Sequence, residues 1–186
     1  VLFFPKDIRL REECRDTFNR CAETLGLEVM GYRRIPVNTE EIGSSALSVE
    51  PEMEQVFIAC PDHINNPDEF ERKLFVLRNY ATHTIASTVK KDAIGFYVAS
   101  LSYKTIIYKG QLTSLQVRGY FPDLRNKKVV SAFGLIHSRF ATNTFPSWKL
   151  AQPFRYIAHN GEINTLQGNL NWLRTSEKNF ISRFFS

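Results

Sequence analysis

The sequence predicts a mixed α/β domain in which amphipathic helices pack on a sheet of short strands. Two segments, 7–26 and 66–87, carry apolar residues at the three- and four-residue spacing of a helix that is buried on one face. Between and after them, short apolar runs end at turn residues, a pattern typical of strands. There is no repeat, low-complexity tract or linker, so residues 1–186 are expected to form a single domain.

The two long helices are indicated by their ends as well as by their spacing. Asp7 can cap the first helix and Gly26 can stop it. Its apolar face would consist of Ile8, Cys14, Phe18, Cys21 and Leu25. Asn66 can cap the second helix, and Pro67 suits a first helical turn. Its apolar face would consist of Phe70, Leu74, Leu77, Ala81 and Ile85.

The other elements are expected to be short. Strands are predicted at residues 27–34, 55–60, 95–102, 105–108, 129–139 and 154–159, the last two as buried neighbours. The polar segment 39–52 is predicted to be a loop, and 113–117 a short helix. Asn164 is a candidate cap for a last helix that carries Leu166, Leu170 and Leu173 on one face.

Composition limits the classes of function that fit. The chain is 43% hydrophobic, so it is expected to fold. The formal net charge is +5, but the basic residues are scattered, so a nucleic-acid partner is not favoured. No apolar run approaches the roughly 18 residues of a membrane span, so a soluble protein without a membrane partner is expected.

The three cysteines, Cys14, Cys21 and Cys60, form no CxxC pair and leave an odd count. This favours neither a zinc site nor a disulfide framework, and it indicates a reduced compartment, which we take to be the cytoplasm. Cys14 and Cys21 are interpreted as small buried hydrophobes on the first helix.

The most informative stretch runs from His137 to Ile163 and contains an arginine at the end of an apolar run. The guanidinium of Arg139 needs an anionic partner if it is buried, and it can hold a carboxylate through two parallel hydrogen bonds. That carboxylate could belong to a substrate or to an internal acid. Spacing alone leaves both interpretations open.

The same stretch contains the pair Asn160-Gly161. The side-chain amide of Asn160 and the backbone N–H of Gly161 can converge to form an oxyanion hole, yet Asn-Gly is also a common hairpin turn. His137 and His159 lack a second ligand or base at a diagnostic spacing. They are interpreted as strand residues with satisfied nitrogens.

One longer run, HSRFATNTFPSWKLAQPFRYIAHNGEINTLQGN, resembles the class II glutamine amidotransferase domain of glutamate synthases. The runs GYRRIPVN, EIGSSA, PEMEQVFI, YKGQL and YFPDL resemble the same domain, so the resemblance covers essentially the whole chain. Class II amidotransferases that act on sugars, aspartate or phosphoribosyl pyrophosphate are the alternatives within this class. The FPSWKLAQPFRYIAH run and the long insert at 6–91 favour the glutamate synthase type.

The resemblance implies the α+β N-terminal nucleophile hydrolase fold, a four-layer αββα sandwich. It also implies hydrolysis of L-glutamine to glutamate and ammonia. An N-terminal cysteine attacks the side-chain amide, its own α-amino group acts as the base, and water then hydrolyses the glutamyl thioester.

The resemblance also assigns roles to residues of this chain. Arg139 would hold the α-carboxylate of glutamine, with Thr142 beside it. Asn160 and Gly161 would form the oxyanion hole, and Glu162 would help to bind the substrate ammonium. No residue is assigned to a cofactor or a metal.

The chain departs from this pattern at its first residue, which is Val1 instead of cysteine. We therefore expect a fragment of a longer gene product that lacks the nucleophile and does not hydrolyse glutamine by itself. We also expect an unpaired sheet edge or face that favours self-association.

The resemblance implies further components in the parent protein. These are FMN, a 3Fe-4S cluster, electrons from NADPH, NADH or ferredoxin, the remaining domains of the large subunit, and a small electron-supplying subunit. The alternative is a non-catalytic binding or structural domain that kept the fold and lost the chemistry.

Overall fold

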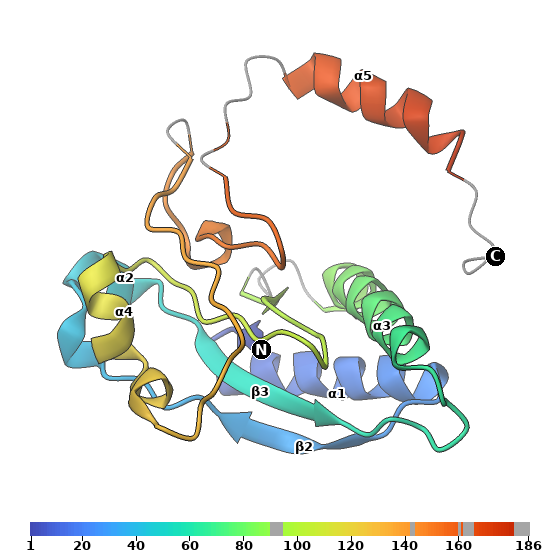
Figure 1. The fold of residues 1–186 in the computed structure, drawn as a ribbon, viewed down its shortest axis with the longest axis horizontal. Helices are drawn as coiled ribbons and strands as arrows, with labels where there is room; N and C mark the ends of the chain where they lie inside the picture. Colours follow the sequence, from blue (N-terminus) through green and yellow to red (C-terminus); the bar gives the residue numbers. More distant parts are fainter. Residues whose placement is uncertain (90–94, 142–143, 160, 162–165, 181–186) are drawn as a thin grey trace.

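The computed structural model describes residues 1–89, 95–141, 144–159, 161 and 166–180. They form a mixed α+β structure around one antiparallel sheet with the strand order β2-β3-β1-β4 (Figure 1). The strands are β1 (Leu2–Phe4), β2 (Val29–Arg34), β3 (Glu52–Ile58) and β4 (Tyr97–Val98). The predicted strands at 27–34 and 55–60 are therefore confirmed with shifted ends. Of the predicted strand 95–102, only two residues pair.

Both long helices form as predicted, as α1 (Ile8–Thr24) and α3 (Pro67–Thr88). The Asp7 side chain accepts a hydrogen bond from the backbone N–H of Leu10, and the Asn66 side chain accepts one from Asp68. Gly26 follows α1 with a φ of 66°, a left-handed conformation that glycine adopts without strain. Local sequence therefore determines where these helices begin and end.

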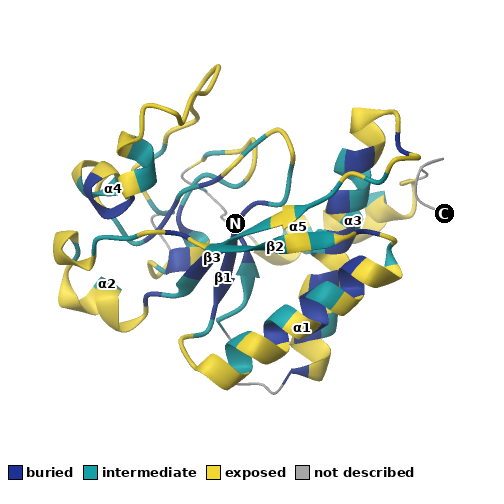
Figure 2. Cartoon of the chain, turned by 90° about the horizontal axis from the view of Figure 1, so that it is seen from below, coloured by how far each residue is buried: buried dark blue, intermediate teal, exposed yellow. Residues whose placement is uncertain are grey.

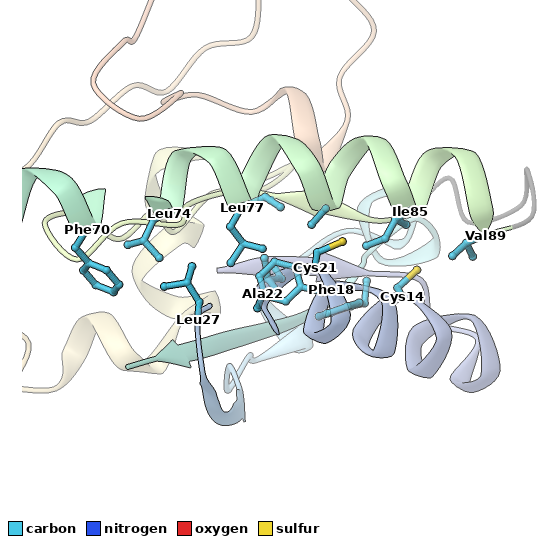
Figure 3. Close-up of a cluster of buried hydrophobic side chains, with 14 of the residues drawn as sticks. Cys14, Phe18, Cys21, Ala22, Leu27, Phe70, Leu74, Leu77, Ile85 and Val89 are labelled. Carbon is cyan, nitrogen blue, oxygen red and sulfur yellow. The ribbon is translucent and has the colours of Figure 1, made fainter. Parts of the chain in front are cut away.

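The two helices pack against each other and cover one face of the sheet (Figure 3). The buried face of α3 is the predicted set of Phe70, Leu74, Leu77, Ala81 and Ile85. The buried face of α1 includes Cys14, Phe18, Cys21 and Ala22, which confirms that Cys14 and Cys21 act as small buried hydrophobes. Ile8 was predicted on this face but is 60% exposed, because it lies in the first turn at the rim of the cluster.

A second hydrophobic cluster lies on the opposite face of the sheet. It joins Val1 and Phe3 of the N-terminal segment to the rings of Tyr120, Phe121 and Trp148. The helices α2 (Ser44–Ser48) and α4 (Ser114–Tyr120) lie on this side, away from α1 and α3 (Figure 2). The short helix predicted at 113–117 is thus confirmed and extends further, to residue 120.

The segment 39–52 is more ordered than the predicted loop. It contains the 3-10 turn η1 (Thr39–Glu41), the helix α2 and the first residue of β3. Gln116 of α4 explains part of this order, because its side chain donates a hydrogen bond of 2.6 Å to the backbone carbonyl of Glu41. This contact joins segments 75 residues apart, so local sequence does not reveal it.

Three predicted strands are wrong. Residues 105–108 form no strand, residues 129–139 form no strand, and residues 154–159 contribute only an isolated bridge between Phe154 and Ile157. The second run is not buried: Val130 and Ile136 are each 86% exposed. A strand needs a neighbour to pair with, and none of the described strands pairs with these segments.

The remaining described elements are η2 (Pro122–Arg125), η3 (Trp148–Leu150) and α5 (Leu166–Glu177). The last helix is confirmed, but it stands apart from the sheet and buries none of its residues (Figure 1). Its predicted cap, Asn164, lies outside the described residues. Among the described helices, none is long and apolar enough to span a membrane.

The helical core predicts the cost of one substitution. Leu77 is fully buried between α1 and α3, so Leu77→Ala should lower the free energy of unfolding by about 2–5 kcal/mol in urea denaturation. Leu115→Ala is the matched control, since Leu115 is also helical but 91% exposed, and it should change the value by less than about 0.5 kcal/mol. Equal effects of the two substitutions would contradict the described core.

Candidate functional site

The two ends of the informative stretch meet in the structure. Gly161 lies against the segment that follows Arg139: a Cβ built on Gly161 would be 3.3 Å from the Cβ of Ala141. The backbone of Gly161 has a φ of 72°, in the left-handed region that favours glycine. The fold therefore brings the predicted arginine segment and the predicted oxyanion-hole glycine side by side.

Arg139 is exposed at the end of the apolar run 129–139. None of the ion pairs among the described residues includes Arg139, so no described internal acid occupies its guanidinium. Its backbone N–H donates a hydrogen bond of 3.1 Å to Nδ1 of His137.

Gly161 makes the same kind of hydrogen bond as Arg139, to the histidine two residues before it. Its backbone N–H donates a hydrogen bond of 2.8 Å to Nδ1 of His159. This bond requires an unprotonated Nδ1, because an imidazolium has no acceptor. In this conformation the N–H is directed at His159, and it reaches a substrate only if the imidazole turns away. Neither histidine was predicted to have this role, since a two-residue spacing is too common to be diagnostic.

Three predicted site residues lie outside the described part of the structure. They are Thr142, Asn160 and Glu162. Their roles beside the α-carboxylate, in the oxyanion hole and at the substrate ammonium remain predictions.

The loop that joins Arg139 to Gly161 is anchored by a buried tryptophan. The indole N–H of Trp148 donates a hydrogen bond of 3.0 Å to the carbonyl of Ala46, and its ring lies 5.5 Å from that of Tyr120. Gly110 packs directly on the other part of this ring, where a Cβ would come within 2.3 Å of it. The loop is therefore held by the second hydrophobic cluster.

A buried lysine was missed by the sequence reasoning. Lys109 is only 3% exposed, and its Nζ donates hydrogen bonds to the carbonyl of Lys149 at 2.8 Å and to the phenol of Tyr97 at 3.2 Å. Nζ also lies 4.7 Å from the ring centre of Tyr97 and 4.2 Å from that of Phe154. Burial, and to a lesser extent the charge of Arg78, lowers the pKa of Lys109 to about 7. Only its place in the YKGQL run could have drawn attention to it.

None of the three cysteines is in an activating environment. Burial, together with the negative charge of Glu13, raises the pKa of Cys14 to about 11, so its thiol stays protonated at neutral pH. Cys21 is buried in the helical core, and Cys60 is exposed beyond the end of β3. None of the hydrogen bonds among the described residues joins a cysteine to a base.

The described residues contain no cluster of three or more His, Cys, Asp or Glu side chains that could hold a metal ion. What they do offer is the backbone N–H of Gly161 beside Ala141, two residues after Arg139. A guanidinium can bind a carboxylate, and a backbone N–H can bind a carbonyl oxygen.

The model of the class II glutamine amidotransferases matches residues 1–186 of the chain. The chain belongs to this family. Within it, the chain is similar to glutamate synthases: it is 44% identical over 185 residues to the glutamate synthase [NADPH] large chain of Bacillus subtilis. That match covers 100% of this chain and 12% of the relative.

Relatives that are named for other electron donors match at similar levels of identity. The glutamate synthase [NADH] of Schizosaccharomyces pombe is 44% identical over 181 residues, covering 95% of this chain and 8% of the relative. The chloroplastic ferredoxin-dependent glutamate synthase 2 of Arabidopsis thaliana is 41% identical over 182 residues, covering 98% of this chain and 11% of the relative. The chain thus spans about a tenth of the length of these relatives.

The buried lysine predicts a pH dependence of stability. Because its pKa is lower in the folded chain than its ordinary value of 10.5, the unfolded chain binds more protons above pH 7, and stability should rise with pH. Between pH 7 and 9 we expect a gain in unfolding free energy of about 2 kcal/mol from this group, measured by urea denaturation. Lys109→Met should remove this contribution.

Lys149→Met is the matched control for that measurement. Its side chain is exposed and its backbone carbonyl, which accepts from Lys109, is retained, so the gain should persist. If Lys109→Met shows the same gain as the unsubstituted chain, the lysine is not buried as described.

Proposed function

We propose that this chain supplies the substrate-binding and oxyanion-stabilising part of the glutaminase site of a glutamate synthase. One observation supports this most directly. In a chain of the class II amidotransferase family, the backbone of Gly161 lies beside Ala141, two residues after Arg139, although Arg139 and Gly161 are 22 residues apart in the sequence. A glutamine molecule has a carboxylate and an amide carbonyl at its two ends, which these two groups would bind.

Each proposed contact has a chemical purpose. Arg139 binds the α-carboxylate through two charge-assisted hydrogen bonds, with Thr142 beside it, and Glu162 pairs with the α-ammonium. The attack of a thiolate on the side-chain amide carbon moves an electron pair onto the carbonyl oxygen. The amide of Asn160 and the N–H of Gly161 then stabilise this negative charge, which exists fully only in the tetrahedral intermediate.

The intermediate collapses to a thioester as its C–N bond breaks and the leaving nitrogen takes up a proton to become ammonia. Water then attacks the thioester and releases glutamate. For Gly161 to take part, its N–H must exchange the Nδ1 of His159 for the substrate oxygen. Substrate binding would therefore have to displace the His159 imidazole.

The proposed nucleophile is a cysteine other than the three in this sequence, because Cys14 and Cys21 are buried, the pKa of Cys14 is raised to about 11, and none of the hydrogen bonds among the described residues joins a cysteine to a base. We propose that it is the N-terminal cysteine of the complete domain, as in the N-terminal nucleophile hydrolases. The complete domain would then have the four-layer αββα architecture, of which the described residues show one antiparallel sheet with helices on both faces.

The wider reaction is proposed from the relatives. Ammonia would pass to a synthase site that converts 2-oxoglutarate to glutamate with FMN, a 3Fe-4S cluster and electrons from NADPH, NADH or ferredoxin. The partners would be the remaining domains of the large chain and a small electron-supplying subunit. A cytoplasmic location and self-association through an unpaired sheet edge or face also remain predictions.

A non-catalytic binding domain is the second candidate. The hydrogen bond between Gly161 and His159 favours it, since the oxyanion donor is occupied in this conformation. Glutaminase activity of the full-length protein separates the two candidates.

The 186-residue chain alone should not hydrolyse glutamine. Without an activated thiolate, the oxyanion donors have no intermediate to stabilise, so purified chain incubated with glutamine should release no ammonia above a buffer blank. The full-length protein serves as the positive control. Ammonia release by the isolated chain at a rate proportional to its concentration would show that a nucleophile is present in these residues.

Arg139→Lys in the full-length protein should raise the KM for glutamine by about 10- to 100-fold with a smaller effect on kcat. The reason is that a lysine cannot make the two parallel hydrogen bonds to the α-carboxylate. Arg174→Lys, an exposed arginine of α5, is the matched control and should leave both constants unchanged. An unchanged KM in Arg139→Lys would remove Arg139 from the site.

A further inference from the structure

Three consecutive residues hold the loop that joins Arg139 to Gly161. Lys109 donates from Nζ to the carbonyl of Lys149 at 2.8 Å, and Gln111 donates from Nε2 to the carbonyl of Pro146 at 2.8 Å. Between them, Gly110 lies flat against the ring of Trp148. The segment 109–111 thus contacts this loop at residues 146, 148 and 149. Two of these contacts are hydrogen bonds to backbone carbonyls.

Lys109 also contacts the part of the loop that leads towards Gly161. Its Nζ lies 4.2 Å from the ring centre of Phe154, while on its other side it contacts both the phenol and the ring of Tyr97 on β4. This one amino group therefore connects the sheet to residues 149 and 154.

Among the described residues, few polar or charged groups face Lys109. Arg78 of α3 exerts a repulsive charge on it, Tyr97 of β4 offers a phenol, and η3 offers the carbonyl of Lys149. None of the ion pairs among the described residues includes Lys109. A buried lysine without a carboxylate is costly, so its presence indicates a purpose other than stability.

We propose that Lys109 is a positioning residue of the glutaminase site, which fixes the 146–154 loop so that Arg139 and Gly161 are held at the separation that glutamine requires. This inference rests on the proposed function for the identity of the ligand. The contacts of Lys109 with the loop do not depend on it.

A lysine suits this position because its apolar stem can be buried while the amine at its end donates a hydrogen bond to a carbonyl. Methionine has nearly the same shape and length but no donor, so Lys109→Met keeps the packing and removes the tether. Arginine keeps both the charge and the donors, although its larger head group has to fit between Tyr97 and Phe154.

The first test follows the loop itself in the 186-residue chain. Amide hydrogen exchange should be at least 10-fold faster in residues 146–157 of Lys109→Met than in the unsubstituted chain, with no change in α1 and α3. Lys149→Met should leave the exchange unchanged, since it keeps the carbonyl that Lys109 binds. An unchanged rate of hydrogen exchange in the loop of Lys109→Met would overturn the proposal, whether or not the protein has glutaminase activity.

The second test is kinetic and uses the full-length protein. Lys109→Met should raise the KM for glutamine by about 10-fold while ammonia-dependent glutamate synthesis stays the same, and Lys109→Arg should recover at least half of the loss. Lys128→Met, an exposed lysine outside the loop, is the control. If faster loop exchange leaves the KM unchanged, the positioning role is wrong. If the unsubstituted protein has no glutaminase activity, the proposed function fails instead.

Discussion

The structure depends on β1, a strand of three residues that is buried on both faces. Leu2 and Phe4 point into the cluster formed by α1 and α3, whereas Phe3 points into the cluster formed by Tyr120, Phe121 and Trp148. Because side chains alternate along a strand, three residues are enough to divide the core into two. β1 also pairs with β3 and β4, so it fixes the sheet that separates the two cores.

The second core connects this sheet to the candidate site. Trp148 belongs both to that core and to the loop between Arg139 and Gly161, and Gly110 permits the close packing of its ring. Lys109 adds a hydrogen bond to the carbonyl of Lys149, the residue after Trp148. Burying its amino group costs free energy that a purely structural residue would not require. The loop of the proposed glutamine site is therefore held by residues far along the chain from Arg139 and Gly161.

How much the sequence could predict differs between parts of the molecule. The limits of α1 and α3 and the buried face of α3 follow from caps and spacing, which are local. The runs 129–139 and 154–159 have strand-like composition, but a strand exists only when a neighbour pairs with it, and composition does not supply one. In the site, Arg139 and Gly161 were predicted from their motifs. The bond between Gly161 and His159 and the burial of Lys109 depend on folded geometry that no spacing rule contains.

The central claim is that Arg139 and Gly161 bind opposite ends of one glutamine molecule. A crystal structure of the full-length protein with bound L-glutamate tests it most directly. Our account predicts two hydrogen bonds of about 2.8 Å from the Arg139 guanidinium to the α-carboxylate, and a Gly161 N–H that has left His159 for an oxygen of the side-chain carboxylate. Glutamate held by other residues, with the Gly161 N–H still bonded to His159, would contradict it.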